Sequence, residues 1–155
     1  MPDIGQMKIQ GLFLDYDGTI SPLNVLRQEA RAPEETRAVL QRIKELIPVC
    51  IITTKDLSFI LPRTPFASAW CAIGGLEIKI GERVITDPCA RAALPYISLA
   101  LAYARHCSDT LLFIEEKRDS TGQTIAFCVD WRQSQDPKEA ESRASRVLAS
   151  CQRPP

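Results

Sequence analysis

Two carboxylates stand at the end of an apolar segment near the start of the chain. Residues 8–15 read KIQGLFLD, which is typical of a buried strand, and Asp17 follows Asp15 after one residue. Two acids in such a place repel each other and lose hydration unless a cation or a proton compensates them. Mg²⁺ is the hard, oxygen-binding ion that fits. One carboxylate could then attack phosphorus while the other transfers protons. The alternative is a polar turn after a strand.

Gly18 follows the second acid and permits the sharp turn that would direct both acids into one crevice. A second apolar segment, 49–53, reads VCIIT and is followed by Thr54 and Lys55. A hydroxyl group at a strand end can hydrogen-bond a phosphoryl oxygen, so Thr53 is a candidate phosphate ligand. The alternative is that the threonines, which favour strands, only finish the strand.

Strands and helices alternate in the first half of the sequence. The expected elements are a strand at 8–15, a helix at 33–47, a fully buried strand at 49–53, a short helix at 56–61 and a strand at 69–73. This order is typical of a Rossmann-like parallel α/β sheet. Ligands bind beyond the carboxyl ends of such strands, so we expect Asp15, Thr53 and Gly74 near one another at one edge of the sheet.

The pattern changes in the second half. The expected elements are a hairpin of strands at 76–80 and 83–86, a helix at 91–107, strands at 111–117 and 123–131, and a helix at 136–150. A boundary near Asp87 therefore divides an α/β core, 1–86, from a small α+β unit, 87–155.

Composition excludes several classes of protein. The 155 residues contain 19 Lys and Arg and 19 Asp and Glu, and a net charge of zero argues against a nucleic-acid binder. No apolar run is long enough to span a membrane, and the polar start of the chain is unlike a signal peptide, so we expect a cytoplasmic protein. The six cysteines form no CxxC pair and only one histidine is present, which favours reduced thiols over zinc ligands. Cys50, Cys71 and Cys128 lie in apolar runs and are expected to be buried.

The segment from Asp15 to Thr19, DYDGT, resembles the first motif of the haloacid dehalogenase (HAD)-like hydrolases. The longer string 13–23, FLDYDGTISPL, is similar to the trehalose-6-phosphate phosphatase branch of that family. The resemblance implies that Asp15 is the nucleophile and Asp17 the general acid and base. It also implies that Mg²⁺ is bound by the side chain of Asp15 and the backbone carbonyl of Asp17.

The second motif of that family is a Ser or Thr at a strand end, often within Ser-Gly-Arg-Asp. Thr53 matches it, whereas Thr54 stands where glycine is usual and Lys55 where arginine is usual. The resemblance thus implies a phosphate site formed by Gly18, Thr53, Thr54 and Lys55.

The second half of the chain resembles the cap domain of the same phosphatases. There a Glu-x-Lys strand pairs with a strand that ends in His-Tyr-Arg, and here IEEK ends at Lys117 and VDWR ends at Arg132. Glu115 and Lys117 alternate onto one face of their strand, so with Arg132 they are the candidate sugar ligands. A solvated charged strand is the alternative, and Trp131 could stack on a sugar or pack in the core.

The family's third motif, a cation, and its fourth, an acidic cluster, have no counterpart in this sequence. The resemblance implies a Mg²⁺-dependent phosphatase of a phosphorylated sugar, with trehalose 6-phosphate first and mannosyl-3-phosphoglycerate or sucrose phosphate as alternatives. It covers only the first part of such an enzyme, an incomplete core with a cap that is cut short. Three explanations remain: a truncated or split phosphatase, a self-contained relative whose cation site uses fewer ligands or a partner chain, and a non-catalytic module that binds a phosphosugar or a protein. A binding module would have no use for both acids, so Asp15 and Asp17 favour the first two. Without the strands that the missing part supplies in the family, the first strand would be an exposed sheet edge, which invites pairing with another chain.

Overall fold

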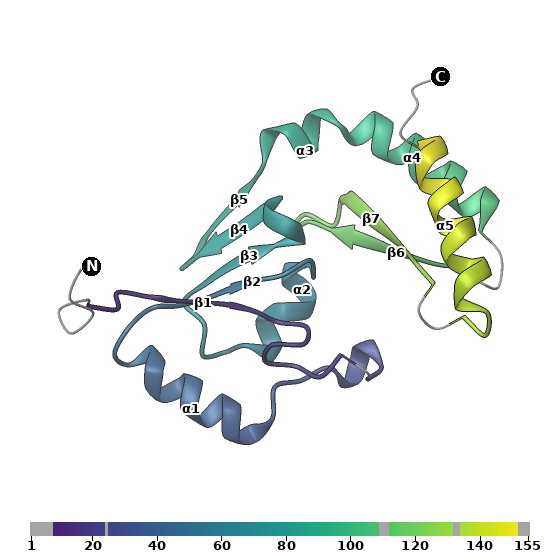
Figure 1. Ribbon diagram of the computed structural model, residues 1–155. Coiled ribbons are helices and arrows are strands. Elements are labelled where there is room, and N and C mark those ends of the chain that lie inside the picture. Colours follow the sequence, from purple (N-terminus) through teal and green to yellow (C-terminus); the bar gives the residue numbers. More distant parts are fainter. Residues whose placement is uncertain (1–7, 24, 109–111, 132–133, 152–155) are drawn as a thin grey trace, which may run out of the picture. The chain divides into compact units, whose positions relative to one another are not determined.

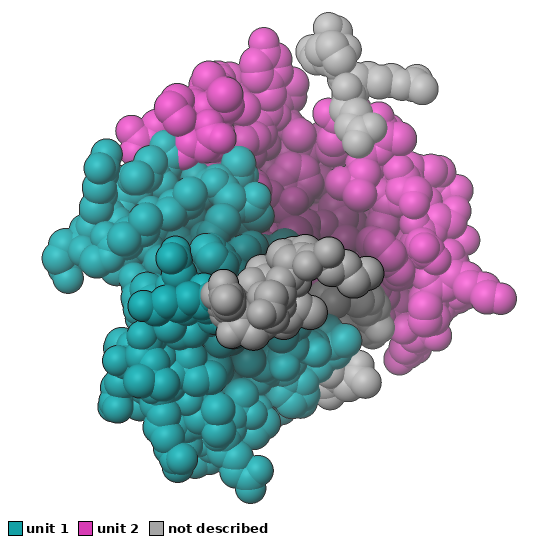
Figure 2. Space-filling model, turned by 60° about the vertical axis from the view of Figure 1, so that its left-hand side comes forward, with its two compact units in different colours: residues 1–86 teal, residues 87–155 magenta. Residues whose placement is uncertain are grey.

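The structure is a computed structural model, and it describes residues 8–23, 25–108, 112–131 and 134–151 (Figure 1). The chain forms two compact units, residues 1–86 and residues 87–155 (Figure 2). Each unit has its own sheet and its own helices. Within the described residues, no helix is both long and apolar enough to cross a lipid bilayer.

Across its described residues, the first unit is built on a five-stranded sheet with the order β1-β2-β3-β4-β5. The strands are β1 (Leu12–Asp15), β2 (Val49–Ile52), β3 (Ala69–Ala72), β4 (Glu77–Ile80) and β5 (Arg83–Thr86). β1, β2 and β3 run parallel, whereas β4 pairs antiparallel with both β3 and β5. The α/β fold class is thereby confirmed, and the predicted hairpin extends the same sheet.

Two α-helices connect the parallel strands, as the sequence predicts. They are α1 (Glu34–Lys44) and α2 (Leu57–Ile60), and short 3-10 helices lie at Arg27–Glu29, Leu61–Arg63 and Ile73–Gly75. Glutamates in the first turn of α1 stabilise the helix, because their negative charges interact favourably with the positive end of the helix dipole. The Asp56 carboxylate begins α2 by accepting a hydrogen bond from the backbone N–H of Phe59 at 2.8 Å.

The two faces of this sheet differ, because α1 and α2 lie on the same side of it (Figure 1). Side chains that point toward the helices, such as Val49 and Ile51, are fully buried. Side chains on the other face, which we call the open face, are not: Phe13 is 69% exposed and Ile52 is 44% exposed. The expectation that the strand at 49–53 is fully buried is therefore wrong for Cys50 and Ile52, since no helix among the described residues of the first unit covers the open face.

β1 is an edge strand in the described part of the first unit, because it pairs only with β2 there. Leu12 is aligned with Val49 and Asp15 with Ile52, so the carboxyl ends of both strands lie side by side. We call this end of the sheet its carboxyl edge. The outer side of β1 presents its backbone groups with no neighbouring strand in the described residues.

The second unit packs helices on a two-stranded antiparallel sheet. Its elements are α3 (Pro88–Ala92), α4 (Leu94–Cys107), β6 (Phe113–Arg118), β7 (Thr124–Asp130) and α5 (Pro137–Cys151). The single helix expected at 91–107 divides at Ala93, because Pro95 has no backbone N–H to continue a helix and instead lies in the first turn of α4.

The core of the second unit lies between its helices and one face of its sheet. Its buried members are small or aliphatic: Ala104, Leu112, Val129, Ala140, Ala144 and Val147. Trp131 packs against this cluster, together with Ile114 and Phe127. Of the two alternatives for Trp131, the structure therefore favours the core aromatic.

All six cysteines are free in the structure. The expectation that three of them are buried is wrong: Cys128 is exposed, and Cys50 and Cys71 are only half-buried. The reason is their position on the strands. Cys128 is paired with Glu115 of β6. Glu115 is adjacent to Ile114, which faces the core, so Glu115 and Cys128 both lie on the opposite face of the sheet. Cys50 and Cys71 lie on the open face of the larger sheet.

Candidate functional site

The carboxyl ends of β1 and β2 bring the first candidate residues to one edge of the sheet. Asp15 ends β1, and Thr53 directly follows β2. The backbone N–H of Thr53 donates to the carbonyl of Cys71 at 2.9 Å, and the N–H of Gly74 donates to the carbonyl of Thr53 at 3.0 Å. Asp15, Thr53 and Gly74 thus share this edge, where the parallel order of the strands predicts them.

A tight turn after β1 places Asp17. The backbone N–H of Gly18 donates to the carbonyl of Ser21 at 2.7 Å, and that of Ser21 donates to the carbonyl of Tyr16 at 2.9 Å. Gly18 has φ +81°, and a Cβ atom there would lie 3.0 Å from Cγ of Leu23. Both the backbone conformation and the close side chain require glycine, which agrees with the turn predicted for this position.

Tyr16, between the two acids, anchors the turn to the helical side of the sheet. Its side chain is fully buried, and its hydroxyl donates to the carbonyl of Ala30 at 2.7 Å. Its ring meets that of Phe59 edge to face, with centroids 6.1 Å apart. Burial raises the pKa of Tyr16 above its usual value. Only the aromatic character of Tyr16, inside an otherwise polar segment, could have indicated this role from the sequence.

Lys55 forms an ion pair with Asp17, with 3.3 Å between Nζ and Oδ2. The backbone of Lys55 is fixed on both sides, because its N–H donates to Oγ1 of Thr53 at 3.1 Å and its carbonyl accepts from Ile73 at 2.9 Å. The side chains of Lys55 and Asp17 are 14% and 30% exposed, so the pair is partly shielded from water. Both residues were predicted for the site from the sequence, but the contact between them was not.

The first acid is more open. Asp15 is exposed, and the hydroxyl of Thr19 lies 3.4 Å from its Oδ2, a long hydrogen bond. Thr53 is buried, whereas Thr54 is exposed. Of the two threonines, Thr53 is thus the one built into the edge of the sheet.

A basic cluster surrounds the ring of Phe59 beside this edge. The guanidinium carbons of Arg27 and Arg63 lie 4.6 Å and 3.9 Å from the ring centroid, and Nζ of Lys55 lies 5.5 Å from it. Arg27 also pairs with Asp56, with 3.3 Å between Nη2 and Oδ2. Arg27 lies in the short 3-10 helix Arg27–Glu29, and nothing in the local sequence links it to Phe59.

In the second unit, Glu115 and Lys117 lie on the face of β6 opposite to the core. Their side chains form an ion pair of 2.8 Å between Oε2 and Nζ. Arg132, the third candidate sugar ligand, lies outside the described residues.

The oxygen donors that the resemblance assigns to Mg²⁺ are the Asp15 carboxylate and the Asp17 carbonyl. Both are hard oxygen ligands, and Asp15 is open to solvent. In the described residues, no three His, Cys, Asp or Glu side chains gather to hold a metal ion. Two oxygen donors would leave the remaining positions of an octahedral ion to water molecules, which is a common arrangement for Mg²⁺.

No protein-family model matches the chain, and no curated protein matches it. Solved structures do. A trehalose-6-phosphate phosphatase related protein shares 18% identity over 92% of this chain, with a TM-score of 0.69. The C-terminal domain of a C. albicans trehalose-6-phosphate phosphatase shares 19% identity over 91% of this chain, with a TM-score of 0.72. A sugar phosphatase of HAD subclass IIB shares 17% identity over 92% of this chain, with a TM-score of 0.52.

This chain covers 61%, 49% and 64%, respectively, of these three proteins, so it spans about half to two thirds of their length. The likeness extends over nearly all of the present sequence, and it includes both units. Over the part that it spans, the chain therefore has the fold of the HAD-like phosphatases.

Proposed function

We propose that this chain carries the catalytic edge of a Mg²⁺-dependent phosphatase that acts on a phosphorylated sugar. One observation carries the proposal: Asp15, Asp17, Thr53 and Lys55 come together at the carboxyl edge of the parallel strands. This is where open α/β sheets bind ligands. The likeness to trehalose-6-phosphate phosphatases supports the same proposal.

In this proposal the Asp15 carboxylate attacks phosphorus and forms an aspartyl-phosphate, and the sugar oxygen leaves. Asp17 donates the proton that the leaving oxygen takes up, and later removes a proton from the water that cleaves the intermediate. Mg²⁺, bound by Asp15 and the Asp17 carbonyl, would neutralise charge on the phosphoryl group.

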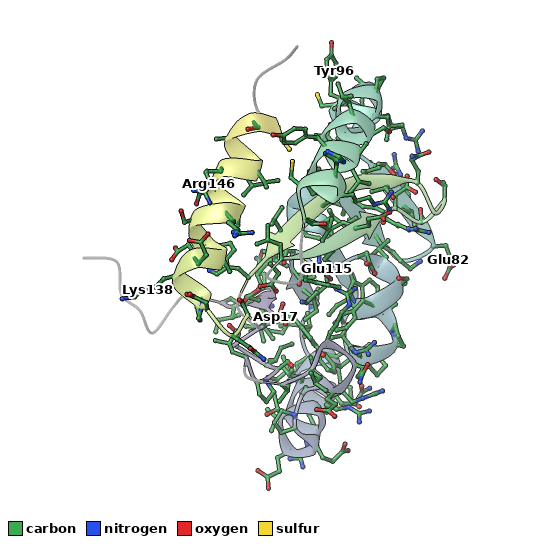
Figure 3. All side chains as sticks on the ribbon, turned by 90° about the vertical axis from the view of Figure 1, so that its right-hand side faces the viewer. Asp17, Glu82, Tyr96, Glu115, Lys138 and Arg146 are labelled. Atoms are coloured by element: carbon green, nitrogen blue, oxygen red, sulfur yellow. The ribbon has the colours of Figure 1, made fainter. Side chains whose placement is uncertain are left out.

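Thr53 and Lys55 bind the phosphoryl oxygens in this mechanism. The hydroxyl oxygen of Thr53 accepts a hydrogen bond from the N–H of Lys55, which leaves its own proton available to a phosphoryl oxygen. Gly18 allows the turn to approach the ligand closely, and Thr54 is an exposed neighbour. In the second unit, Glu115 (labelled in Figure 3) and Lys117 are the proposed ligands of sugar hydroxyls, together with Arg132, which lies outside the described residues.

Trehalose 6-phosphate is the first substrate to test, and mannosyl-3-phosphoglycerate and sucrose phosphate are the alternatives. The chain, with Mg²⁺ or with EDTA, is incubated with these esters, and phosphate release is measured. Asp15→Asn should abolish release, because an amide is not a nucleophile here. Asp17→Asn should slow it by about 10²–10⁴-fold. Glu82→Gln, at an exposed hairpin tip, is the matched control and should leave release unchanged. Full activity in Asp15→Asn would contradict the nucleophile assignment, and release that EDTA does not affect would contradict the metal.

A second candidate function is that of a binding module, or of one part of an enzyme completed by a second copy or a partner chain. The open face of the sheet favours it, and so does the outer side of β1, which has no neighbouring strand in the described residues. Both leave apolar surface or backbone groups for another polypeptide. In that case the isolated chain should bind a sugar phosphate but release phosphate at least about 10²-fold more slowly than the enzyme median of about 10 s⁻¹. Sedimentation and turnover measured on one preparation separate the two candidates.

A further inference from the structure

We propose that Asp17 and the phosphoryl group of a ligand compete for the ammonium of Lys55, so that Lys55 is a positioning residue which holds Asp17 until an anion binds. The inference rests on the proposed function for the identity of the anion, a phosphate monoester. It starts from the ion pair between Lys55 and Asp17, which lie in two different loops, with 3.3 Å between Nζ and Oδ2.

The backbone fixes where the ammonium can reach. Because Lys55 is hydrogen-bonded through its N–H to Thr53 and through its carbonyl to Ile73, only its side chain is free to turn. Nζ has the Asp17 carboxylate at 3.3 Å and the ring of Phe59 at 5.5 Å. The aromatic ring offers a weaker attraction than a carboxylate, so Asp17 is the stronger of these two contacts.

In the proposed function Thr53 and Lys55 bind one phosphoryl group, so the ammonium that pairs with Asp17 is the same one that the ligand needs. The Thr53 hydroxyl oxygen is bonded to the N–H of Lys55, and a phosphoryl oxygen that accepts the remaining hydroxyl proton therefore lies next to the Lys55 residue. A phosphate monoester carries about −1.5 to −2 charges near neutral pH, against −1 for a carboxylate. The ligand is thus the stronger partner for one shared positive charge.

The other nearby cations are held by contacts of their own. The guanidinium of Arg63 donates to the carbonyls of Ala30, Phe59 and Gln28, and Arg27 pairs with Asp56. When a phosphoryl group binds Lys55, Asp17 is released from its ion pair. The released carboxylate can then take up a proton from solvent and turn to the bridging oxygen of the ester, to which a general acid must deliver that proton.

The test is a double-mutant cycle, with inorganic phosphate as the probe and no metal present. Phosphate binding is measured by calorimetry for the wild type, Asp17→Asn, Lys55→Met and the double variant. Asp17→Asn should tighten binding by about 3- to 30-fold, because the ammonium loses its competitor, and Lys55→Met should weaken it by a similar factor. In the Lys55→Met background, Asp17→Asn should change the affinity less than about twofold. Asp17→Ala should behave as Asp17→Asn does, which excludes a new hydrogen bond from the amide.

Lys55→Arg is the matched control, since it keeps the charge and should keep both phosphate binding and the response to Asp17→Asn. If Lys55 had only a structural role, Lys55→Arg and Lys55→Met should weaken phosphate binding to the same extent. The NMR signal of the Lys55 ammonium nitrogen provides a second readout: it should shift in Asp17→Asn, and in the wild type it should shift with the Asp17 carboxyl carbon as phosphate is added. Equal effects of Asp17→Asn in both backgrounds would overturn the inference, as would a wild-type chain that binds no phosphate.

These outcomes are separable from those of the proposed function. If the Lys55 and Asp17 substitutions have coupled effects on phosphate binding but the chain has no phosphatase activity, the competition for Lys55 is supported and the proposed function is contradicted. If the chain has phosphatase activity that depends on Asp15, but the Lys55 and Asp17 substitutions have additive effects on phosphate binding, the proposed function is supported and the competition for Lys55 is contradicted.

Discussion

The two faces of the five-stranded sheet carry similarly apolar residues but have different surroundings. On the helical side, Ile51 and Tyr16 are fully buried, and on the open face, Phe13 and Ile52 contact solvent. The candidate site joins both sides: Tyr16 fixes the turn in the core, while Asp15 points to the open face. The difference shows that helix placement, and not strand composition alone, decides which apolar residues form the core.

The largest expected effect comes from Ile51 in the middle of β2. Ile51→Ala should lower the free energy of unfolding by about 2–5 kcal/mol, because it removes fully buried methyl groups and leaves a cavity. Its matched control is Ile52→Ala, the next residue on the open face, which should cost less than about 1 kcal/mol because much of that side chain is already in water. Urea unfolding measures both. Equal losses would mean that the open face is covered in solution.

The sequence predicts the order of the elements and the edge at which Asp15 and Thr53 meet. It does so because each of these depends on local signals, such as a strand end or the glycine of a turn. It does not predict which strand residues face the helices, since runs such as LFL and VCII are apolar at every position and carry no period of two.

Contacts between distant residues were also beyond the reach of the sequence. Lys55 is 38 residues from Asp17, and Arg27 is 32 residues from Phe59. A single sequence fixes neither the direction of a long side chain nor the path of a loop, although the residue types of Lys55 and Asp17 did indicate a charged site.

A smaller effect is expected at the anchor of the turn. Tyr16→Phe removes the hydroxyl that donates to the carbonyl of Ala30, and it should lower the free energy of unfolding by about 1 kcal/mol. Tyr96→Phe, at an exposed tyrosine in the second unit, is the control and should have no measurable effect. If the two substitutions behaved alike in urea unfolding, Tyr16 would not be an anchor.

The buried Tyr16 should also make the free energy of unfolding depend on pH in the alkaline range. Burial raises the pKa of folded Tyr16 above 10.0, its ordinary value, so the unfolded chain loses this proton first as the pH rises. The stabilisation is complete below pH 10.0 and declines as the pH rises through the folded pKa. Urea unfolding on both sides of that pH should therefore show a steeper alkaline loss in the wild type than in Tyr16→Phe. Parallel losses in the two proteins would refute the buried hydroxyl.

The smallest effect on stability is expected on the open face. Phe13→Thr keeps a strand-forming residue and removes an aromatic ring that is 69% exposed, so the free energy of unfolding should change by less than about 0.5 kcal/mol. Self-association is the sensitive readout, because Phe13 is exposed apolar surface on β1, whose outer side has no neighbouring strand in the described part of the chain, and this favours contact between chains. Sedimentation velocity over a range of concentrations should show less association in Phe13→Thr than in the wild type. Val39→Thr, which removes an exposed apolar side chain from α1, is the control and should not alter association. A loss of more than about 2 kcal/mol in Phe13→Thr would place Phe13 in a packed environment and erase the difference between the two faces.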